Sequence, residues 1–147
     1  MIRKRFIFND ELWNGGLMSG LEYSDGKLFL KGSGKAFYIS PPLDSGEKET
    51  FWGRMKVGFE LFGDASILVS YMAYNDENVA VDGEIINISE MLEDFRISDE
   101  DKFLIVERLC KTKKKNTDDI ILSDAKGRFF RFIIEMNASE NSKAVVF

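Results

Sequence analysis

The side chains available for chemistry in this chain are mainly carboxylates and lysines, because the sequence has no histidine and a single cysteine, Cys110. Histidine is the commonest general base and metal ligand in proteins, and it also activates serine and cysteine nucleophiles. A Ser-His or Cys-His pair is therefore excluded, and a zinc or iron centre is not expected. We predict no catalytic residue, no cofactor and no metal, and hence a protein that is not an enzyme.

Acidic clusters are the remaining candidates for a chemical site. Asp76-Glu77, Asp99-Glu100-Asp101 and Asp118-Asp119 offer the oxygen ligands that calcium prefers, but none has the spacing of an EF-hand loop. Asp99–Asp101 follows Ser98 and is simply explained as the first turn of a helix. A glycosidase pair of carboxylates has no recognisable frame in this sequence. Calcium binding and glycoside hydrolysis are therefore alternatives that no motif supports.

Asp44 and Arg128 are opposite charges suited to a structural bond. Asp44 follows a proline corner and Arg128 begins an apolar strand, so a bidentate, charge-assisted bond between them would lock two sheets together. In the alternative, Asp44 caps only its own turn and Arg128 points to water. Trp52, an aromatic anchor between sheets, and Gly127, in the turn before Arg128, complete the predicted structural clamp.

Aromatic residues offer a second kind of site. Five of them could form a platform for a sugar ring: Trp13, Tyr38, Trp52, Tyr71 and Tyr74. Packing in the core is the alternative, because buried aromatic rings are common in β-sandwiches. Trp13 lies beside the polar turn Asn14-Gly15-Gly16 and is predicted to be exposed. Trp13 and Tyr74 are therefore the candidate ligand contacts, and carbohydrate is the candidate ligand.

The composition indicates one globular domain over residues 1–147. Hydrophobic residues make up 44% of the 147 residues and aromatic residues 13%, which is enough to bury a core. The chain has 25 acidic and 20 basic residues and a net charge of −5, whereas a nucleic-acid binder needs a basic face. One cysteine cannot form an intrachain disulfide. We therefore expect no nucleic-acid partner.

Neither a membrane segment nor a signal peptide is expected. The sequence has no apolar run of the roughly 18 residues that a spanning helix needs. Arg3-Lys4-Arg5 is basic, but the apolar stretch that follows stops at Asn9-Asp10. This is too short for the apolar region of a signal peptide. We predict synthesis in the cytoplasm.

Alternating apolar and polar residues predict strands along most of the chain. Phe51–Phe62 is expected to be one half-buried strand, and Ile67–Tyr74, apolar on both faces, a central one. The remaining strands are expected at residues 1–9 (a short edge strand containing Phe6–Phe8), Leu21–Tyr23, Lys27–Leu30, Lys35–Ile39, Asp118–Leu122, Arg128–Met136 and Ala144–Phe147.

Residues 79–117 interrupt the strand pattern and predict a small helical insertion at about 85–115. Ser89–Phe95 is expected to form a short helix, and Ser98 to cap a second one. Lys111–Lys115 would be its cationic end, which suits the helix dipole. The expected fold is mainly β, an antiparallel, jelly-roll-like β-sandwich with this insertion.

Three segments stand out by the order of their residues: Ser40–Gly46 with Trp52, Ser70–Asp76, and Asp119–Leu122 with Lys126–Phe130. Together they resemble the phage-tail-like protein family of contractile injection systems. Ser40–Gly46, reading SPPLDSG, and the following Trp52 resemble the family's LDSG…W corner. Ser70–Asp76 resembles a family strand that ends in a Ser/Asn-Asp pair. Asp119–Leu122 and Lys126–Phe130 resemble its D-x-LL…GRYL element.

The resemblance covers most of residues 20–147 and implies a β-rich, non-catalytic part of a tail-like particle. Phe129-Phe130 stand where the family prefers tyrosine and leucine, and the 79–117 insertion has no clear counterpart. We expect a structural or assembly subunit, released as part of such a particle, whose partners are other particle proteins or copies of itself. The alternative is a carbohydrate-binding β-sandwich module that uses exposed aromatic residues.

Overall fold

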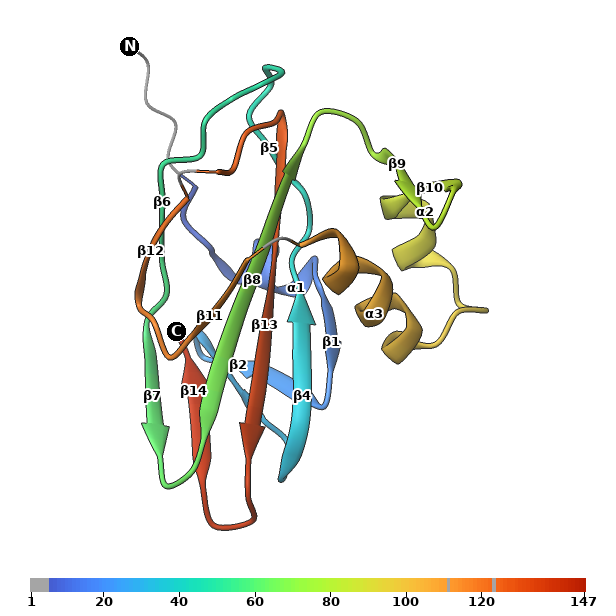
Figure 1. Ribbon diagram of the computed structural model, residues 1–147. Coiled ribbons are helices and arrows are strands. Elements are labelled where there is room, and N and C mark those ends of the chain that lie inside the picture. Colours follow the sequence, from blue (N-terminus) through green and yellow to red (C-terminus); the bar gives the residue numbers. More distant parts are fainter. Residues whose placement is uncertain (1–5, 111, 123) are drawn as a thin grey trace.

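The computed structural model describes residues 6–110, 112–122 and 124–147, in which a six-stranded and a four-stranded antiparallel sheet pack together (Figure 1). Two further pairs of short strands complete the β-structure, and two of the helices cover the outer face of the larger sheet. The predicted mainly-β, antiparallel β-sandwich with a helical insertion is therefore confirmed. Among the described residues the helices are α1 (Asp10–Asn14), α2 (Ile88–Glu93) and α3 (Asp99–Leu109). Each of these is too short and too polar to cross a bilayer. The basic residues Arg3-Lys4-Arg5 near the start of the chain lie outside the described residues.

The larger sheet is built around a long central strand, β13. Its strands are β1 (Leu17–Ser19), β4 (Gly34–Ile39), β5 (Leu43–Asp44), β8 (Ser66–Tyr74), β11 (Thr112–Lys115) and β13 (Phe129–Ala138). Their order across the sheet is β1-β4-β13-β8-β11, and β5 pairs with the beginning of β13. Ile133 of β13 lies opposite Ile39 of β4 and Ser70 of β8. A strand with neighbours on both sides and packing on both faces explains the nearly continuous apolar run of β13.

The smaller sheet has the strand order β2-β3-β14-β7. Its strands are β2 (Leu21–Ser24), β3 (Lys27–Leu30), β7 (Phe59–Phe62) and β14 (Lys143–Val146). Asp25 and Gly26 join β2 to β3, with φ values of 50° and 75°. Two such residues in a row form the tight turn that suits the twist of a hairpin.

The predicted single strand Phe51–Phe62 is two strands, β6 (Arg54–Lys56) and β7, and the prediction of one element is wrong. The chain changes partners between them. Val57 N donates to Asp118 O at 2.8 Å, beside β12 (Asp119–Ile121), which pairs with β6. Gly58 O accepts from Phe147 N at 2.9 Å, beside β14. Alternation of side chains continued through this break, so periodicity alone did not reveal it.

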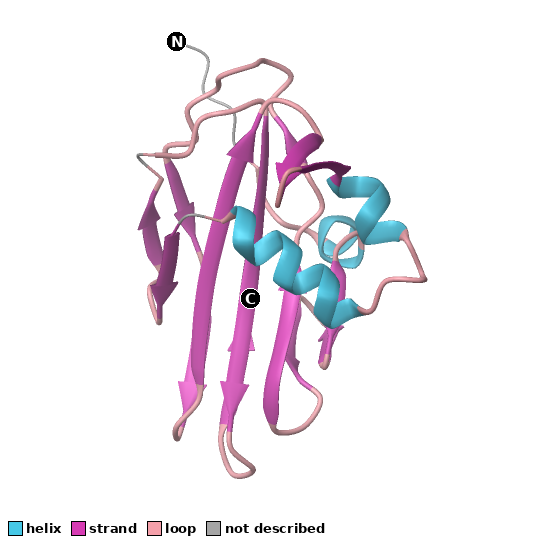
Figure 2. Ribbon diagram, turned by 45° about the vertical axis from the view of Figure 1, so that its right-hand side comes forward, coloured by secondary structure: helices cyan, strands magenta, loops and turns pink. Residues whose placement is uncertain are grey.

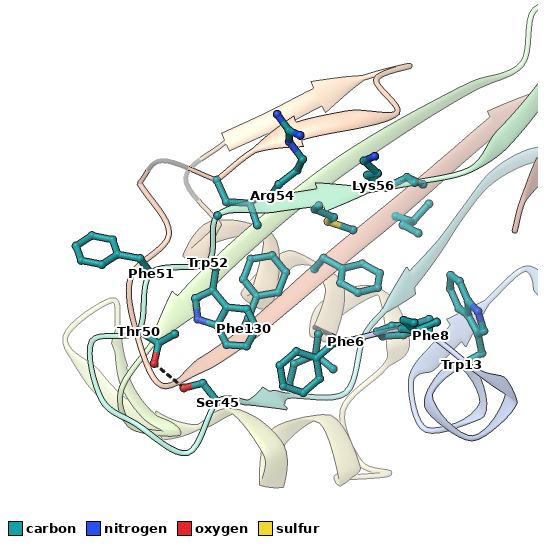
Figure 3. A pocket seen from close by; sticks show the side chains of 18 of the residues that line it. Phe6, Phe8, Trp13, Ser45, Thr50, Phe51, Trp52, Arg54, Lys56 and Phe130 are labelled. Carbon is teal, nitrogen blue, oxygen red and sulfur yellow. Dashed lines mark hydrogen bonds between the residues drawn. The ribbon is translucent and has the colours of Figure 1, made fainter. Parts of the chain in front are cut away.

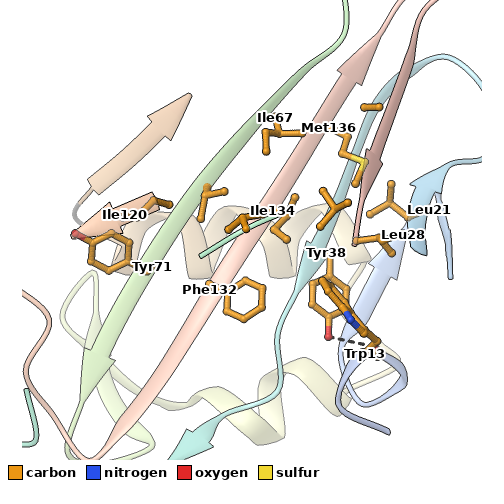
Figure 4. Packing of buried hydrophobic residues seen from close by; sticks show 14 of the residues in the cluster. Trp13, Leu21, Leu28, Tyr38, Ile67, Tyr71, Ile120, Phe132, Ile134 and Met136 are labelled. Atoms are coloured by element: carbon orange, nitrogen blue, oxygen red, sulfur yellow. Dashed lines mark hydrogen bonds between the residues drawn. The ribbon is translucent and has the colours of Figure 1, made fainter. Parts of the chain in front are cut away.

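The main core lies between the two sheets (Figure 4). Alternate residues of β13, including Ile134 and Met136, point into it and are almost fully buried. Val146 of the smaller sheet packs on them from the other side. Tyr38 of β4 is also buried, and its hydroxyl donates to the carbonyl of Trp13 at 3.1 Å. Burial raises the pKa of Tyr38 above its ordinary value.

A second core covers the outer face of the larger sheet, where the insertion packs (Figure 2). The insertion consists of α2, α3 and the hairpin of β9 (Asn78–Val81) and β10 (Glu84–Asn87). Val106 of α3 and Ile88 of α2 are fully buried against the sheet. The rings of Phe37 and Phe103 stack with centroids 4.7 Å apart. β13 therefore separates two cores, one on each face.

Three details of the predicted elements are wrong. The insertion contains the β9–β10 hairpin within a region expected to lack strands. Lys113–Lys115 belong to strand β11, paired with β8, instead of the end of a helix, while Lys111 lies outside the described residues. Backbone pairing with the edge of β8 outweighs the preference of lysine for a helix end. Phe6–Phe8 lie outside the described strands.

Candidate functional site

The predicted clamp residues come together at one end of the larger sheet. Arg128 Nε donates to Asp44 Oδ1 at 2.8 Å, and Arg128 Nη2 donates to Asp44 Oδ2 at 2.9 Å, which is a bidentate geometry. Asp44 Oδ1 also accepts from the backbone N–H of Gly46 at 2.8 Å, so this carboxylate caps its own turn as well. The hydrogen bonds to Asp44 raise the pKa of Arg128.

This ion pair lies within one sheet. Asp44 belongs to β5 and pairs across strands with Phe129 of β13, and Arg128 immediately precedes β13, so the bond joins neighbouring parts of the larger sheet. The expectation that the pair locks the two sheets together is therefore wrong. The Asp44 and Arg128 side chains are 42% and 40% exposed, so water screens their attraction.

Gly127 and Trp52 form the tightly packed part of the clamp. A Cβ atom on Gly127 would lie 2.4 Å from the backbone N of Tyr74, which is closer than van der Waals contact allows. Glycine has no Cβ atom and therefore fits at this position. Trp52 Nε1 donates to Gly127 O at 2.8 Å, and its ring stacks on Phe130 with centroids 5.1 Å apart. Gly127 N in turn donates to Thr50 O at 2.9 Å. Gly127 therefore packs directly against the backbone of Tyr74, while its own N–H and C=O groups bond to the loop that contains Thr50 and Trp52.

Asn75 is a clamp residue that the sequence reasoning missed. Its Oδ1 accepts from the backbone N–H groups of Glu49 at 2.8 Å and Arg128 at 3.0 Å. It joins the loop after β8 to the loop that follows β5 and to the loop that carries Gly127 and Arg128. Its position at the end of an apolar strand, next to Tyr74, was the available signal. Turn residues are so common at such places that this signal is weak.

The two candidate ligand contacts are buried. Trp13 lies in α1 and is 7% exposed, with Tyr38 and Phe8 ring centroids each 5.0 Å away. The expectation of an exposed Trp13 is wrong, because its ring packs in the main core even though the turn beside it is polar. Tyr74 is 9% exposed and packs in the second core. Neither ring is available as an exposed platform for a sugar.

Tyr74 belongs to a buried polar network that sequence reasoning also missed. Arg131, which is 3% exposed, donates to Tyr74 Oη at 2.7 Å, Ser89 Oγ at 2.8 Å and Ser40 O at 3.1 Å. Tyr74 donates to Glu77 Oε1 at 2.9 Å, and burial raises the pKa of its phenol. An arginine in the middle of an apolar strand was the signal. The network ties α2, through Ser89, to the outer face of the larger sheet.

A groove of about 1230 Å³ runs beside the clamp and into the main core (Figure 3). The inner wall is aromatic and includes Trp52, Phe130 and Phe132. Phe6 lies against it, with its ring centroid 5.4 Å from that of Trp52. Strand β6 forms another wall along Gly53–Val57. The groove is thus an apolar opening between the two sheets.

Exposed apolar side chains concentrate at this groove. Among the described residues, nine large apolar side chains are exposed, and four of them line the groove: Phe6, Ile7, Phe51 and Phe147. Isolated exposed apolar residues are ordinary, but a group around one opening is typical of an interaction site.

Charge at the groove comes from Glu47 and from Arg54 and Lys56 on β6. Arg54 Nε lies 3.2 Å from Asp119 Oδ1, and both side chains are about half exposed. Lys56 is exposed and forms no ion pair with the residues that the structure describes. The β6 wall therefore presents positive charge beside an apolar floor.

The site offers apolar and charged side chains for contacts with a partner. Within the described residues, no three acidic or cysteine side chains are close enough to hold a metal ion. No protein-family model, curated protein or solved structure matches this chain. The resemblance of its three segments to the phage-tail-like family therefore stays a prediction.

Proposed function

We propose that the protein is a non-enzymatic assembly subunit of a phage-tail-like particle and that it acts through protein–protein contacts at the groove. The observation that carries this proposal is the group of exposed apolar side chains around the opening. Exposed apolar surface of this kind is costly to leave in water and is stabilised when a partner covers it.

The placement in a tail-like particle is supported by the positions of the three resembling segments. Asp44 from the first, Asn75 from the second and Arg128 from the third meet through hydrogen bonds in the clamp. The groove opens directly beside them, with Trp52 shared by both. A family motif that builds one end of a sandwich would thereby hold the contact surface in place.

Co-assembly with neighbouring gene products tests this function. The protein would be produced together with the proteins encoded beside it, and complexes would be detected by size-exclusion chromatography with light scattering. We expect a complex with a sheath, tube or baseplate protein, and we expect Phe51→Ser to weaken it. Phe51 is 72% exposed, so the change should leave the fold intact.

Phe95→Ser is the matched control. Phe95 is 93% exposed but lies next to α2 and outside the groove lining. Equal loss of the complex in both variants would contradict a contact at the groove. A gene neighbourhood without particle genes but with glycan genes would contradict the particle role itself.

Carbohydrate binding is the second candidate, and Trp52 is the observation in its favour. Trp52 is the one predicted platform residue that is only partly buried and also lines the groove. A glycan array and affinity gels test this alternative directly. Retention that Trp52→Ala abolishes, in a variant still folded by circular dichroism, would favour a carbohydrate-binding module over an assembly subunit.

A further inference from the structure

We propose that the groove binds an extended, acidic–apolar segment of a partner protein, which adds as a β-strand to the free edge of β6. This inference rests on the proposed function and names the partner's chemistry. The edge, the groove and the charge beside it each contribute one part of the argument.

The edge of β6 that faces away from β12 has no strand beside it among the described residues. Successive residues of a strand direct their backbone polar groups to opposite edges. Gly53 O and Val57 N bond to Leu122 and Asp118, on the β12 side. Gly58 O bonds to Phe147 N, on the opposite side, where β14 lies. The backbone N–H and C=O groups of residues 54 and 56 therefore point to the same side as β14. They lie beyond Phe147 in the direction in which β14 runs.

This open stretch coincides with the groove. The groove is lined by Gly53–Val57, by Val146 at the end of β14 and by the following residue, Phe147. An extended chain placed there would continue the line of β14 and run antiparallel to β6. It would pair with main-chain groups that otherwise bond to water, which is the usual basis of β-strand addition.

The two faces of the added strand would meet different surroundings. One face would meet the accessible apolar side chains of the groove, the partly buried Trp52 and the exposed Phe6 and Phe147, so alternate side chains should be apolar. Phe130 and Phe132 lie buried beneath Trp52 and Phe8. The other face would lie beside Arg54 and Lys56, which follow the period of two along β6. Lys56 has no anionic partner in the described part of the chain. Glutamate or aspartate at the remaining positions would supply one.

The same charge argument disfavours the N-terminus of a second copy. Residues 3–5 of this chain are Arg3, Lys4 and Arg5, which would meet the like charges of the β6 wall. Phe6 and Phe8 already contact the aromatic side of the groove, through Trp52 and Phe132. A partner segment with negative charge therefore fits the β6 side better than another copy of this segment.

A synthetic peptide of eight residues tests the proposal, with glutamate alternating with valine and phenylalanine. Binding would be measured by isothermal titration calorimetry. Two controls define the mode: a scrambled peptide without the alternation, and a pair of peptides N-methylated on one backbone edge or the other. We expect the alternating peptide to bind, the scrambled one to fail, and only one of the two methylation patterns to abolish binding.

Charge is tested with Lys56→Glu. We expect this variant to weaken binding of the glutamate peptide by about tenfold or more, because like charges across an interface are unfavourable. A peptide with lysine in place of glutamate should gain affinity for the variant. Lys114→Glu is the matched control, because Lys114 is an exposed lysine on β11 of the larger sheet. This variant should leave both affinities unchanged.

The outcomes separate this inference from the proposed function. Absence of binding, or equal binding of both methylated peptides, would overturn strand addition, whereas a complex sensitive to Phe51→Ser would keep the assembly role. Peptide binding with every expected signature but no complex with particle proteins would contradict the particle role alone. A dimer of the protein that the peptide dissociates would assign the edge to a second copy and overturn the acidic partner.

Discussion

Single residues in the clamp connect loops that are far apart in the sequence. Asp44, Asn75 and Arg128 each hydrogen-bond to more than one backbone or side-chain group, so three loops depend on one another at this end of the molecule. The clamp residue Trp52 also lines the groove. A change in one clamp residue should therefore affect stability first and binding second.

Gly127 should be the clamp residue least tolerant of substitution. Gly127→Ala places a methyl group 2.4 Å from the backbone N of Tyr74, and backbone cannot rotate away as a side chain does. We expect a loss of about 1–3 kcal/mol or more in the free energy of unfolding, as for other overpacked sites. Urea titration followed by circular dichroism measures it.

Gly53→Ala is the control for this prediction. A Cβ atom on Gly53 has no heavy atom within 4 Å, and its φ is not in the left-handed region. The free energy of unfolding should change by about 0.5 kcal/mol or less. Similar losses in both variants would show that the contact with Tyr74 is not the cause.

Arg128→Ala should lower the melting temperature slightly. The bidentate bond to Asp44 is lost, but both partners are well exposed, and such pairs contribute little in water. Differential scanning fluorimetry at low and high salt measures the effect, which should shrink as salt increases. Arg128→Lys keeps the charge without the two-pronged geometry and should fall between wild type and Arg128→Ala. An identical melting temperature in all three proteins would mean that the pair does not stabilise the fold.

Two turns at the opposite end of the sandwich are joined at the level of secondary-structure elements. Asp64, in the turn between β7 and β8, accepts from Ser139 N at 3.0 Å through Oδ1. Its own backbone N–H donates to Ser142 Oγ at 3.0 Å. Ser139 and Ser142 lie between β13 and β14. These hydrogen bonds, which we call the Asp64 staple, therefore join the β7–β8 connection to the β13–β14 connection, and both connections cross from one sheet to the other. Hydrogen bonds from Ser142 and Ser139 lower the pKa of Asp64 from 3.8 to about 2.

This staple predicts an acid-dependent part of the stability. A carboxylate whose pKa is lower in the folded protein stabilises the fold above its ordinary pKa, and that contribution is lost as the pH falls from about 4 towards 2. Asp64→Asn keeps a hydrogen-bond acceptor but cannot titrate. We therefore expect a smaller fall in melting temperature over this pH range in Asp64→Asn than in wild type.

Glu60→Gln controls for the change in net charge, because it removes an exposed carboxylate on the adjacent strand β7. Its melting temperature should follow that of wild type between pH 4 and pH 2. The prediction fails if Asp64→Asn loses as much stability in acid as the other two proteins.

The whole molecule has two cores that share β13. Ile133 and Ile134 are neighbours in this strand, each 1% exposed, and they face the second core and the main core respectively. Truncation of either to alanine should cost about 2–5 kcal/mol, as is usual for a buried isoleucine. If the insertion and the sandwich unfold together, both variants should shift one cooperative thermal transition to lower temperature.

Differential scanning calorimetry of the two variants provides the measurement. A new, separate low-temperature transition in Ile133→Ala alone would show that the insertion unfolds independently of the sandwich. Hydrogen exchange would then locate the early opening to α2 and α3.

Sequence alone determined the mainly-β class, the β2–β3 turn and the helical insertion, because these depend on local periodicity and turn chemistry. It also brought Asp44 and Arg128 together as a candidate pair. Only the tertiary structure decided which strands neighbour one another, and this placed that pair within one sheet. In the tertiary structure Trp13 and Tyr74 are buried. Phe51–Phe62 contains two strands, because the chain changes pairing partners there, and Lys113–Lys115 belong to a strand. Burial and pairing depend on residues distant in the chain, so local patterns could not reveal the open edge of β6 and its groove.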